Sequence, residues 1–153
     1  MLAKDIMKPD VIALSPDTPV REIARLVIER DISGFPVVDG EGRLLGAVSE
    51  HDLMYKTVDL DVPSVWELCT WSVLGSKEIY EYKDSFRKHR SKTAAELMNS
   101  PAVSVDENDD ASKAGNLMFS RRMKRIFVTR EGKLTGVISR SAFVRMLIES
   151  ELD

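Results

Sequence analysis

A heptad that occurs twice decides the fold: G-A-V-S-E-H-D at residues 46–52 and G-V-I-S-R-S-A at residues 136–142. Each copy has a glycine, two apolar residues and a serine, an order typical of a strand that turns into a helix with the serine as its N-cap. The copies then differ, because the first ends in Asp52 and the second in Ala142. The pair predicts one structural corner built twice, with a carboxylate kept in one copy only.

The sequence around the two heptads repeats as well, with an offset of 91 residues before a turn and 90 after it. Each half contains an amphipathic run with the i, i+3, i+4, i+7, i+8 spacing of a helix that buries one face. Apolar runs on both sides of a glycine-containing turn then predict a β-hairpin. The matched ranges are 11–14 with 102–105 (a short strand), 20–28 with 111–119 (the helix), and 34–38 with 125–129 and 44–48 with 134–138 (the hairpin).

These elements predict an α/β (α+β) fold made of two pseudo-symmetric β-α-β-β-α repeats. Because a unit of about 50 residues has little core of its own, the two repeats are expected to pack sheet to sheet. We place repeat 1 at residues 1–56 and repeat 2 at residues 93–153, and together they form one module. Residues 57–92 are an insertion between them.

The insertion is too long for a plain loop and predicts two helices. S-V-W-E at residues 64–67 is a capping box that opens a helix ending near Gly75, and residues 77–90 form the second helix. Six of the ten aromatic residues lie between residues 55 and 86. The insertion is then a helical clip on the side of the module, a dimer or partner surface, or a lid over a cleft. Cys69 is expected to be a small buried apolar residue.

Composition excludes several classes of protein. A net charge of −3 gives no broad attraction to phosphate, so a nucleic-acid partner is not expected. A single cysteine excludes an internal disulfide and a multi-cysteine zinc site, and it suits a cytoplasmic location. The sequence contains no run of about 18 apolar residues, so no membrane span is predicted and no membrane partner is expected. The chain lacks a P-loop, G-x-S-x-G and metal-ligand spacing, so neither an enzyme nor a metal site is expected.

The motifs, taken together, resemble a tandem pair of CBS domains, the family named from cystathionine β-synthase. D-I-M-K-P at 5–9 and E-L-M-N-S-P at 96–101 open the repeats, G-F-P-V-V-D follows at 34–39, and G-h-h-S-x-x-D (h apolar) closes the first repeat. As a set these motifs are specific to that family, whereas G-x-x-S-x-x-D alone is a weak signal. The resemblance covers residues 1–56 and 93–150.

The resemblance implies a non-catalytic regulatory module, commonly a homodimer, that acts as an energy or metabolite sensor. Its ligand would be an adenosine-containing molecule (AMP, ADP, ATP or S-adenosylmethionine) bound between the repeats, with AMP or ATP favoured. The alternative is a protein-interaction adaptor that regulates a partner enzyme through the aromatic insertion, with nucleotide binding secondary.

The family's ribose-binding Asp and its Ser correspond to Asp52 and Ser49 of this chain, and its phosphate-side basic residue corresponds to Arg125. A carboxylate accepts hydrogen bonds from both hydroxyls of a ribose, and a guanidinium pairs with phosphate. The set assigned to this cleft is Phe35, Pro36, Val48, Ser49, Asp52, Ala102, Val103, Lys124 and Arg125. Two plainer interpretations stay open: Asp52 complements the dipole of its helix, or Arg125 belongs to a solvated basic face.

A second, pseudo-symmetric cleft is expected to be weak or empty. It would use Val11, Ile12, Ser139 and Arg140, with Ala142 and Gly34 in the positions that Asp52 and Arg125 hold in the first cleft. A ribose there would lack its carboxylate, and a phosphate would lack its guanidinium.

Overall fold

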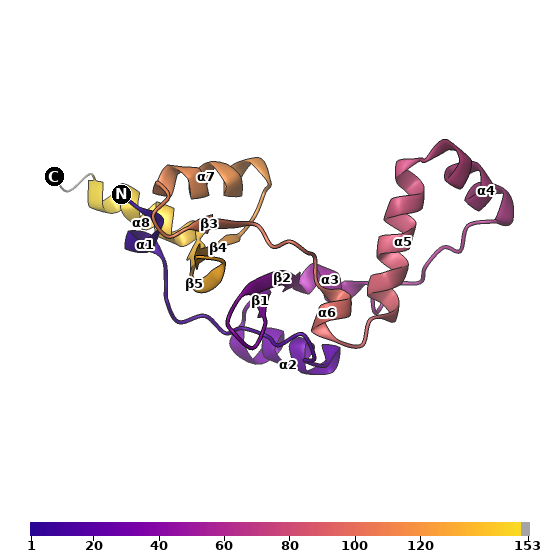
Figure 1. Cartoon of the computed structure of the whole chain (residues 1–153), viewed down its shortest axis with the longest axis horizontal. Helices are drawn as coiled ribbons and strands as arrows, with labels where there is room; N and C mark the ends of the chain where they lie inside the picture. Colours follow the sequence, from indigo (N-terminus) through magenta and orange to yellow (C-terminus); the bar gives the residue numbers. More distant parts are fainter. Residues whose placement is uncertain (151–153) are drawn as a thin grey trace.

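The computed structural model describes residues 1–150, and it forms two small β-sheets with helices around them (Figure 1). The first sheet is the antiparallel hairpin of β1 (Gly34–Val38) and β2 (Leu44–Ser49). The second has the order β3-β4-β5, with β3 (Ser104–Asp106) parallel to β4 (Arg125–Arg130) and β4 antiparallel to β5 (Lys133–Ser139). The mixed α+β fold and both hairpins are as predicted.

The helices follow the predicted duplication. Those of the repeats are α2 (Val20–Arg30) and α3 (Glu50–Met54) in the first, and α7 (Ala111–Ser120) and α8 (Arg140–Ser150) in the second. Two single-turn helices, α1 (Ala3–Ile6) and α6 (Ala94–Leu97), cover the D-I-M-like motifs. The insertion holds α4 (Val65–Leu74) and α5 (Lys77–Arg90), and Gly75 ends α4 in the left-handed conformation, as its position predicts.

The short strand predicted at residues 11–14 is wrong. In repeat 1 only Leu14 makes a bridge, with Val37, whereas its counterpart in repeat 2 becomes β3. The difference lies at the next positions, where Pro16 corresponds to Glu107. The backbone N–H of Glu107 donates to Thr129 O at 2.9 Å. Proline has no N–H, so the same ladder cannot continue in repeat 1.

The opening motifs are exchanged between the repeats. The N-terminal motif pairs with β5 of repeat 2, through Lys8 and Val137 at 2.9 and 3.0 Å. The second motif pairs with β2 of repeat 1, through Asn99 and Ala47 at 2.9 and 3.0 Å. Each hydrophobic core therefore includes a helix from the other repeat: Ala3 packs with Val105, Ala114, Ile126 and Ile138, and Ala94 and Leu97 pack with Leu14, Ile23, Phe35 and Val48.

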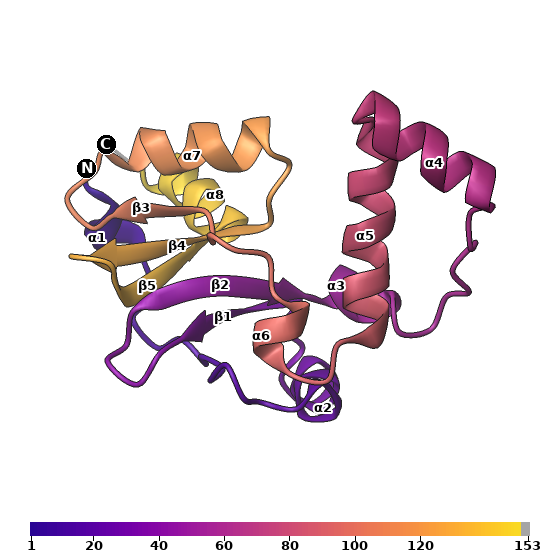
Figure 2. The same ribbon diagram turned by 45° about the vertical axis from the view of Figure 1, so that its right-hand side comes forward.

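This exchange explains the glycine that opens each heptad. A Cβ at Gly46 would lie 2.6 Å from Met98 Sδ, and one at Gly136 would lie 2.5 Å from Met7 Sδ. Only a residue without a side chain allows the methionine of the other repeat's motif to lie against the strand. The two sheets face each other with β2 beside β5 (Figure 2).

The insertion stands away from both sheets, with α4 at its far end (Figures 1 and 2). No residue of α4 is buried, and Cys69 is exposed, so the expectation of a buried Cys69 is wrong. The physical reason is that α4 packs chiefly against α5 and reaches neither core. The C-terminal turn of α5 lies against the module, because Lys56 Nζ donates to His89 O and Ser91 O, both at 2.6 Å.

Candidate functional site

A cavity of about 260 Å³ lies between the repeats, at the corner formed by the first heptad. Repeat 1 supplies β1, β2 and the start of α3, and repeat 2 supplies the start of β4. Six of the residues assigned to the cleft from sequence line this cavity: Phe35, Val48, Ser49, Asp52, Lys124 and Arg125. The structure thus brings together residues that are up to 90 positions apart in the sequence.

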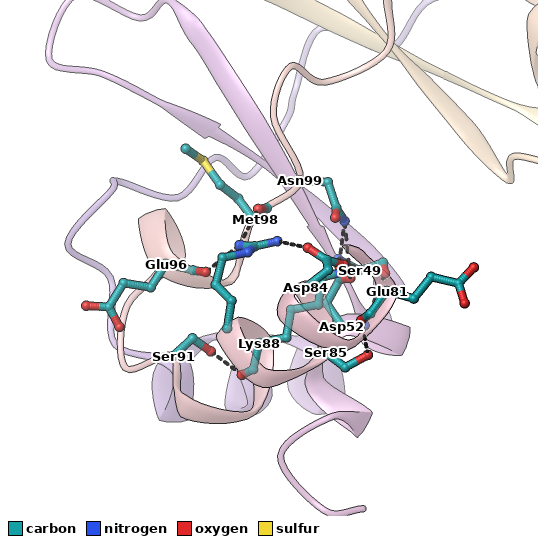
Figure 3. Close-up of polar contacts among 11 residues, drawn as sticks. Ser49, Asp52, Glu81, Asp84, Ser85, Lys88, Ser91, Glu96, Met98 and Asn99 are labelled. Atoms are coloured by element: carbon teal, nitrogen blue, oxygen red, sulfur yellow. Dashed lines mark hydrogen bonds and ion pairs between the residues drawn. The ribbon is translucent and has the colours of Figure 1, made fainter. Parts of the chain in front are cut away.

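Asp52 is buried and lies in a dense set of hydrogen bonds (Figure 3). Its Oδ2 accepts from the backbone N–H of Ser49 at 2.8 Å and from Ser49 Oγ at 2.9 Å, which completes a capping box for α3. The side-chain amide of Asn99 donates to both carboxylate oxygens, at 3.1 and 3.2 Å. Asp52 therefore caps its helix and also binds the exchanged motif of repeat 2.

Lys88 of α5 is the partner of Asp52 that the sequence analysis missed. Its Nζ donates to Asp52 Oδ1 at 2.7 Å, and the two side chains are only 7% and 3% exposed. Burial acts to raise the pKa of Asp52, but the bonds from Lys88, Ser49 and Asn99 outweigh it and hold the pKa below its usual value. Asp52 is consequently a carboxylate at neutral pH.

Repeat 2 supplies two cations to the lining of the cavity, Lys124 and Arg125. Arg125 is half-buried and donates from Nη1 to Gly34 O at 3.1 Å and from Nη2 to Ser33 Oγ at 3.2 Å. Burial lowers the pKa of Arg125, and Glu50 partly opposes that effect, so the guanidinium stays charged. Lys124 Nζ lies 3.3 Å from Glu50 Oε1, and both of these side chains are exposed. The lining of the cavity thus includes the buried carboxylate of Asp52, the two cations Lys124 and Arg125, and the carboxylate of Glu50 paired with Lys124.

Three assigned residues do not line this cavity. Pro36 lines a separate cavity of about 120 Å³, and Val103 packs against the core of repeat 2. Ala102 lines neither of these two cavities. In their place the walls include Phe127 and Asn99, which sequence reasoning did not assign. Asn99 had a signal in the sequence, because it is a polar residue directly after the methionine of the E-L-M-N-S-P motif.

The residues of the expected second cleft do not meet in one place. Val11 and Ile12 line the cavity of about 120 Å³, and Ser139 lines another of about 210 Å³ beside Ala142. Arg140 lines neither, because it donates to the backbone carbonyls of Met123 at 3.0 Å and Arg122 at 3.4 Å.

At the second corner Ser139 Oγ bonds to Ser141 Oγ at 2.7 Å in place of the missing carboxylate. Among the side chains that the structure describes, those of residues 1–148, no three His, Cys, Asp or Glu are placed to hold a metal ion. Within the same described range, no helix has both the length and the apolar character needed to cross a membrane.

Comparison with known proteins identifies the family of the chain. The CBS domain family model matches residues 3–59 and 94–149, on either side of the α4–α5 insertion. The uncharacterized protein MJ1426 of Methanocaldococcus jannaschii is 27% identical over 155 residues, covering 97% of this chain and 92% of that protein. The chloroplastic CBS domain-containing protein CBSX1 of Arabidopsis thaliana is 28% identical, and the match covers 93% of this chain and 61% of CBSX1.

Among solved structures, CBSX2 in complex with AMP matches with a TM-score of 0.80 and 26% identity, covering 97% of both chains. The CBS domain pair of MJ0100, solved with 5′-methylthioadenosine and S-adenosyl-L-methionine, has a TM-score of 0.66 at 17% identity, which supports the fold alone. The chain belongs to the CBS-domain family, and it carries two CBS repeats separated by a helical insertion.

Proposed function

We propose that this chain is a non-catalytic regulatory module that binds an adenosine-containing ligand in the cavity between its repeats and acts as an energy or metabolite sensor. The observation that carries the proposal is the pairing of Asp52 and Ser49 from repeat 1 with Lys124 and Arg125 from repeat 2 around one cavity. The similarity to CBSX2, which was solved in complex with AMP, supports the same ligand class.

Each part of such a ligand has a matching group in the cavity. The carboxylate of Asp52 suits the two hydroxyls of a ribose, and the rings of Phe35 and Phe127 offer apolar walls for a base. Arg125 and Lys124 suit a phosphate. The volume of about 260 Å³ lies just below the range of roughly 300–1,000 Å³ usual for small-molecule sites. This modest size favours AMP over ATP.

The exposed apolar residues support the proposal that the module is a homodimer. They occur in pseudo-symmetric pairs on the outer helices, with Ile28 matched by Phe119 and Met54 matched by Val144. A second copy of the module that packs on these helices would remove both members of each pair from water. A cytoplasmic location stays a prediction.

A second candidate function is an adaptor that regulates a partner enzyme through the insertion. The observation that favours it is α4, whose Trp66 is 83% exposed and whose neighbours Val65, Val73 and Leu74 are exposed as well. Such a helix, apolar on all faces, is normally covered by other protein. This function would replace the sensor if the full chain bound none of the adenosine ligands tested below.

Isothermal titration calorimetry of the full chain with AMP, ATP and S-adenosylmethionine tests the sensor proposal. We expect AMP to bind, and Asp52→Ala to weaken it at least tenfold, because one charge-assisted hydrogen bond contributes about 1.5–3 kcal/mol. Asp52→Asn keeps the shape of the corner and should weaken binding too, whereas the exposed Asp59→Ala is the matched control. No binding to the wild type, or unaltered binding by both Asp52 variants, would count against the proposal.

A further inference from the structure

The residue that neutralises Asp52 comes from outside the family pattern. Lys88 lies in α5, between the two matched ranges 3–59 and 94–149, so the CBS repeats themselves do not supply it. Its ammonium group is buried against the carboxylate that the proposed function assigns to ribose. Figure 3 shows the chain of contacts from Ser49 and Asp52 through Lys88 to Asp84.

In the described structure the hydrogen-bonding capacity of Asp52 is full. A carboxylate has about four lone-pair sites. Four donor groups already occupy them: Lys88 Nζ, Asn99 Nδ2, the Ser49 N–H and Ser49 Oγ. A ribose that donates a hydroxyl to Asp52 must therefore displace one of these donors.

Lys88 is the donor for which the described structure offers a second carboxylate. Ser49 caps α3, and the backbone of Asn99 pairs with Ala47 on β2, so both of these residues also hold the corner together. Lys88 Nζ already has a second carboxylate nearby, since Asp84 Oδ2 lies 3.4 Å away on the preceding turn of α5. Asp84 is about half exposed, so a move toward it takes the ammonium group from a buried position toward water.

Asp84 connects this move to the rest of the insertion. Arg87 Nη2 donates to Asp84 Oδ1 at 2.7 Å, and Arg87 Nη1 donates to the carbonyl of Met98 at 3.0 Å, next to Asn99. Lys88 would therefore share Asp84 with a residue that holds α5 to the exchanged motif. Lys88, Asp84 and Arg87 thus connect Asp52 to the backbone of Met98, and Asn99, the next residue, contacts Asp52 again. A change at Asp52 can therefore alter the contacts of α5 and those of the exchanged motif.

From these contacts we propose that Lys88 is a competing group for the ribose position: it occupies Asp52 in the ligand-free chain, and a vicinal diol displaces it onto Asp84. The inference rests on the proposed function, because it concerns the same cavity. Through Lys88 the insertion would set the affinity of that cavity for its ligand. Binding of the ligand would in turn change the position of Lys88 on α5, because the ligand binds the state with Lys88 on Asp84 more tightly than the state with Lys88 on Asp52.

Calorimetry of the full chain with two probes, AMP and 2′,3′-dideoxy-AMP, tests this proposal. Lys88→Met removes the competing ammonium group and keeps its length, so we expect AMP to bind about tenfold more tightly. The dideoxy probe lacks the diol and should bind the variant and the wild type equally. Lys83→Met, which changes an exposed lysine of the same helix, is the matched control and should alter neither affinity.

Asp84→Asn tests the second carboxylate of Lys88, and it changes a residue that is more exposed than Lys88. Lys88 then loses its second carboxylate, so AMP binding should weaken about fivefold while binding of the dideoxy probe stays unchanged. The proposal is overturned if Lys88→Met weakens AMP binding or leaves it unchanged, if it tightens both probes equally, or if Asp84→Asn leaves AMP affinity unchanged. A wild type that binds none of AMP, ATP and S-adenosylmethionine would overturn the proposed function, whereas the outcomes above in a wild type that binds AMP would overturn only the role of Lys88.

Discussion

Replacing Gly46 by alanine tests how the exchanged motifs are held. The new Cβ would lie 2.6 Å from Met98 Sδ, 2.7 Å from Asn99 O and 3.0 Å from Met98 Cγ. Carbon atoms in contact normally stay about 3.5–4.0 Å apart, so the neighbours must retreat by on the order of 1 Å. Met98 has a flexible side chain, but Asn99 O is backbone and is fixed by its bond from the Ala47 N–H at 3.0 Å.

We therefore expect Gly46→Ala to lower the free energy of unfolding by about 2 kcal/mol, within the range of roughly 1–3 kcal/mol for overpacking. For a chain of 153 residues this corresponds to a fall in Tm of about 4–8 °C. Urea unfolding followed by circular dichroism measures the loss, as a lower midpoint at an unchanged m-value. Gly136→Ala should cost a similar amount, because Met7 Sδ lies 2.5 Å from the corresponding position.

Gly40→Ala is the matched control. It has no atom within 4 Å of the new Cβ, and its φ is not in the left-handed region, so we expect a change within about 0.5 kcal/mol. If Gly46→Ala were as mild as Gly40→Ala, the close approach of the exchanged motif to β2 would be contradicted.

Three further predictions concern charge, pH and exposure. Arg125→Met should weaken AMP about tenfold but adenosine little, because only AMP carries the phosphate that the guanidinium would bind; calorimetry with both ligands checks this, and equal losses would contradict it. The lowered pKa of Asp52 contributes stability that is present above its usual pKa of about 3.9 and is lost as the pH falls through the lower folded value. Between about pH 5 and about pH 3, the Tm of Asp52→Asn should therefore fall less than the Tm of the wild type. Parallel curves of Tm against pH for the two proteins would refute this. Cys69, exposed on α4, should react with Ellman's reagent in the folded protein as fast as it does in urea, and a protected thiol would refute that placement.

Local patterns were sufficient to predict most of the elements. Apolar spacing gave α2 and α7, the Gly-containing turns gave both hairpins, and the capping box at Ser64 gave the start of α4. These features depend on residues close together in the sequence, where side-chain periodicity is informative. The strand predicted at residues 11–14 is absent because Pro16, unlike its counterpart Glu107, has no backbone N–H to continue the ladder.

Contacts between residues far apart in the sequence could not be predicted from local sequence patterns. The exchange of the opening motifs depends on pairings such as Ala47 with Asn99, which no local period encodes. Lys88 was missed because it belongs to the insertion, which has no copy to compare with, and a lysine on an amphipathic helix normally faces solvent. Cys69 was misplaced because its apolar neighbours indicated burial, whereas α4 stands at the far end of the insertion.

The most direct test of the account is a crystal structure of the full chain grown with AMP. We expect one AMP per chain, with its ribose beside Asp52 and its phosphate beside Arg125, and no AMP in the cavity lined by Ser139 and Ala142. AMP bound in the Ser139 cavity, or absent from the cavity of Asp52 at saturating concentration, would contradict the claim that the first corner alone forms the working site.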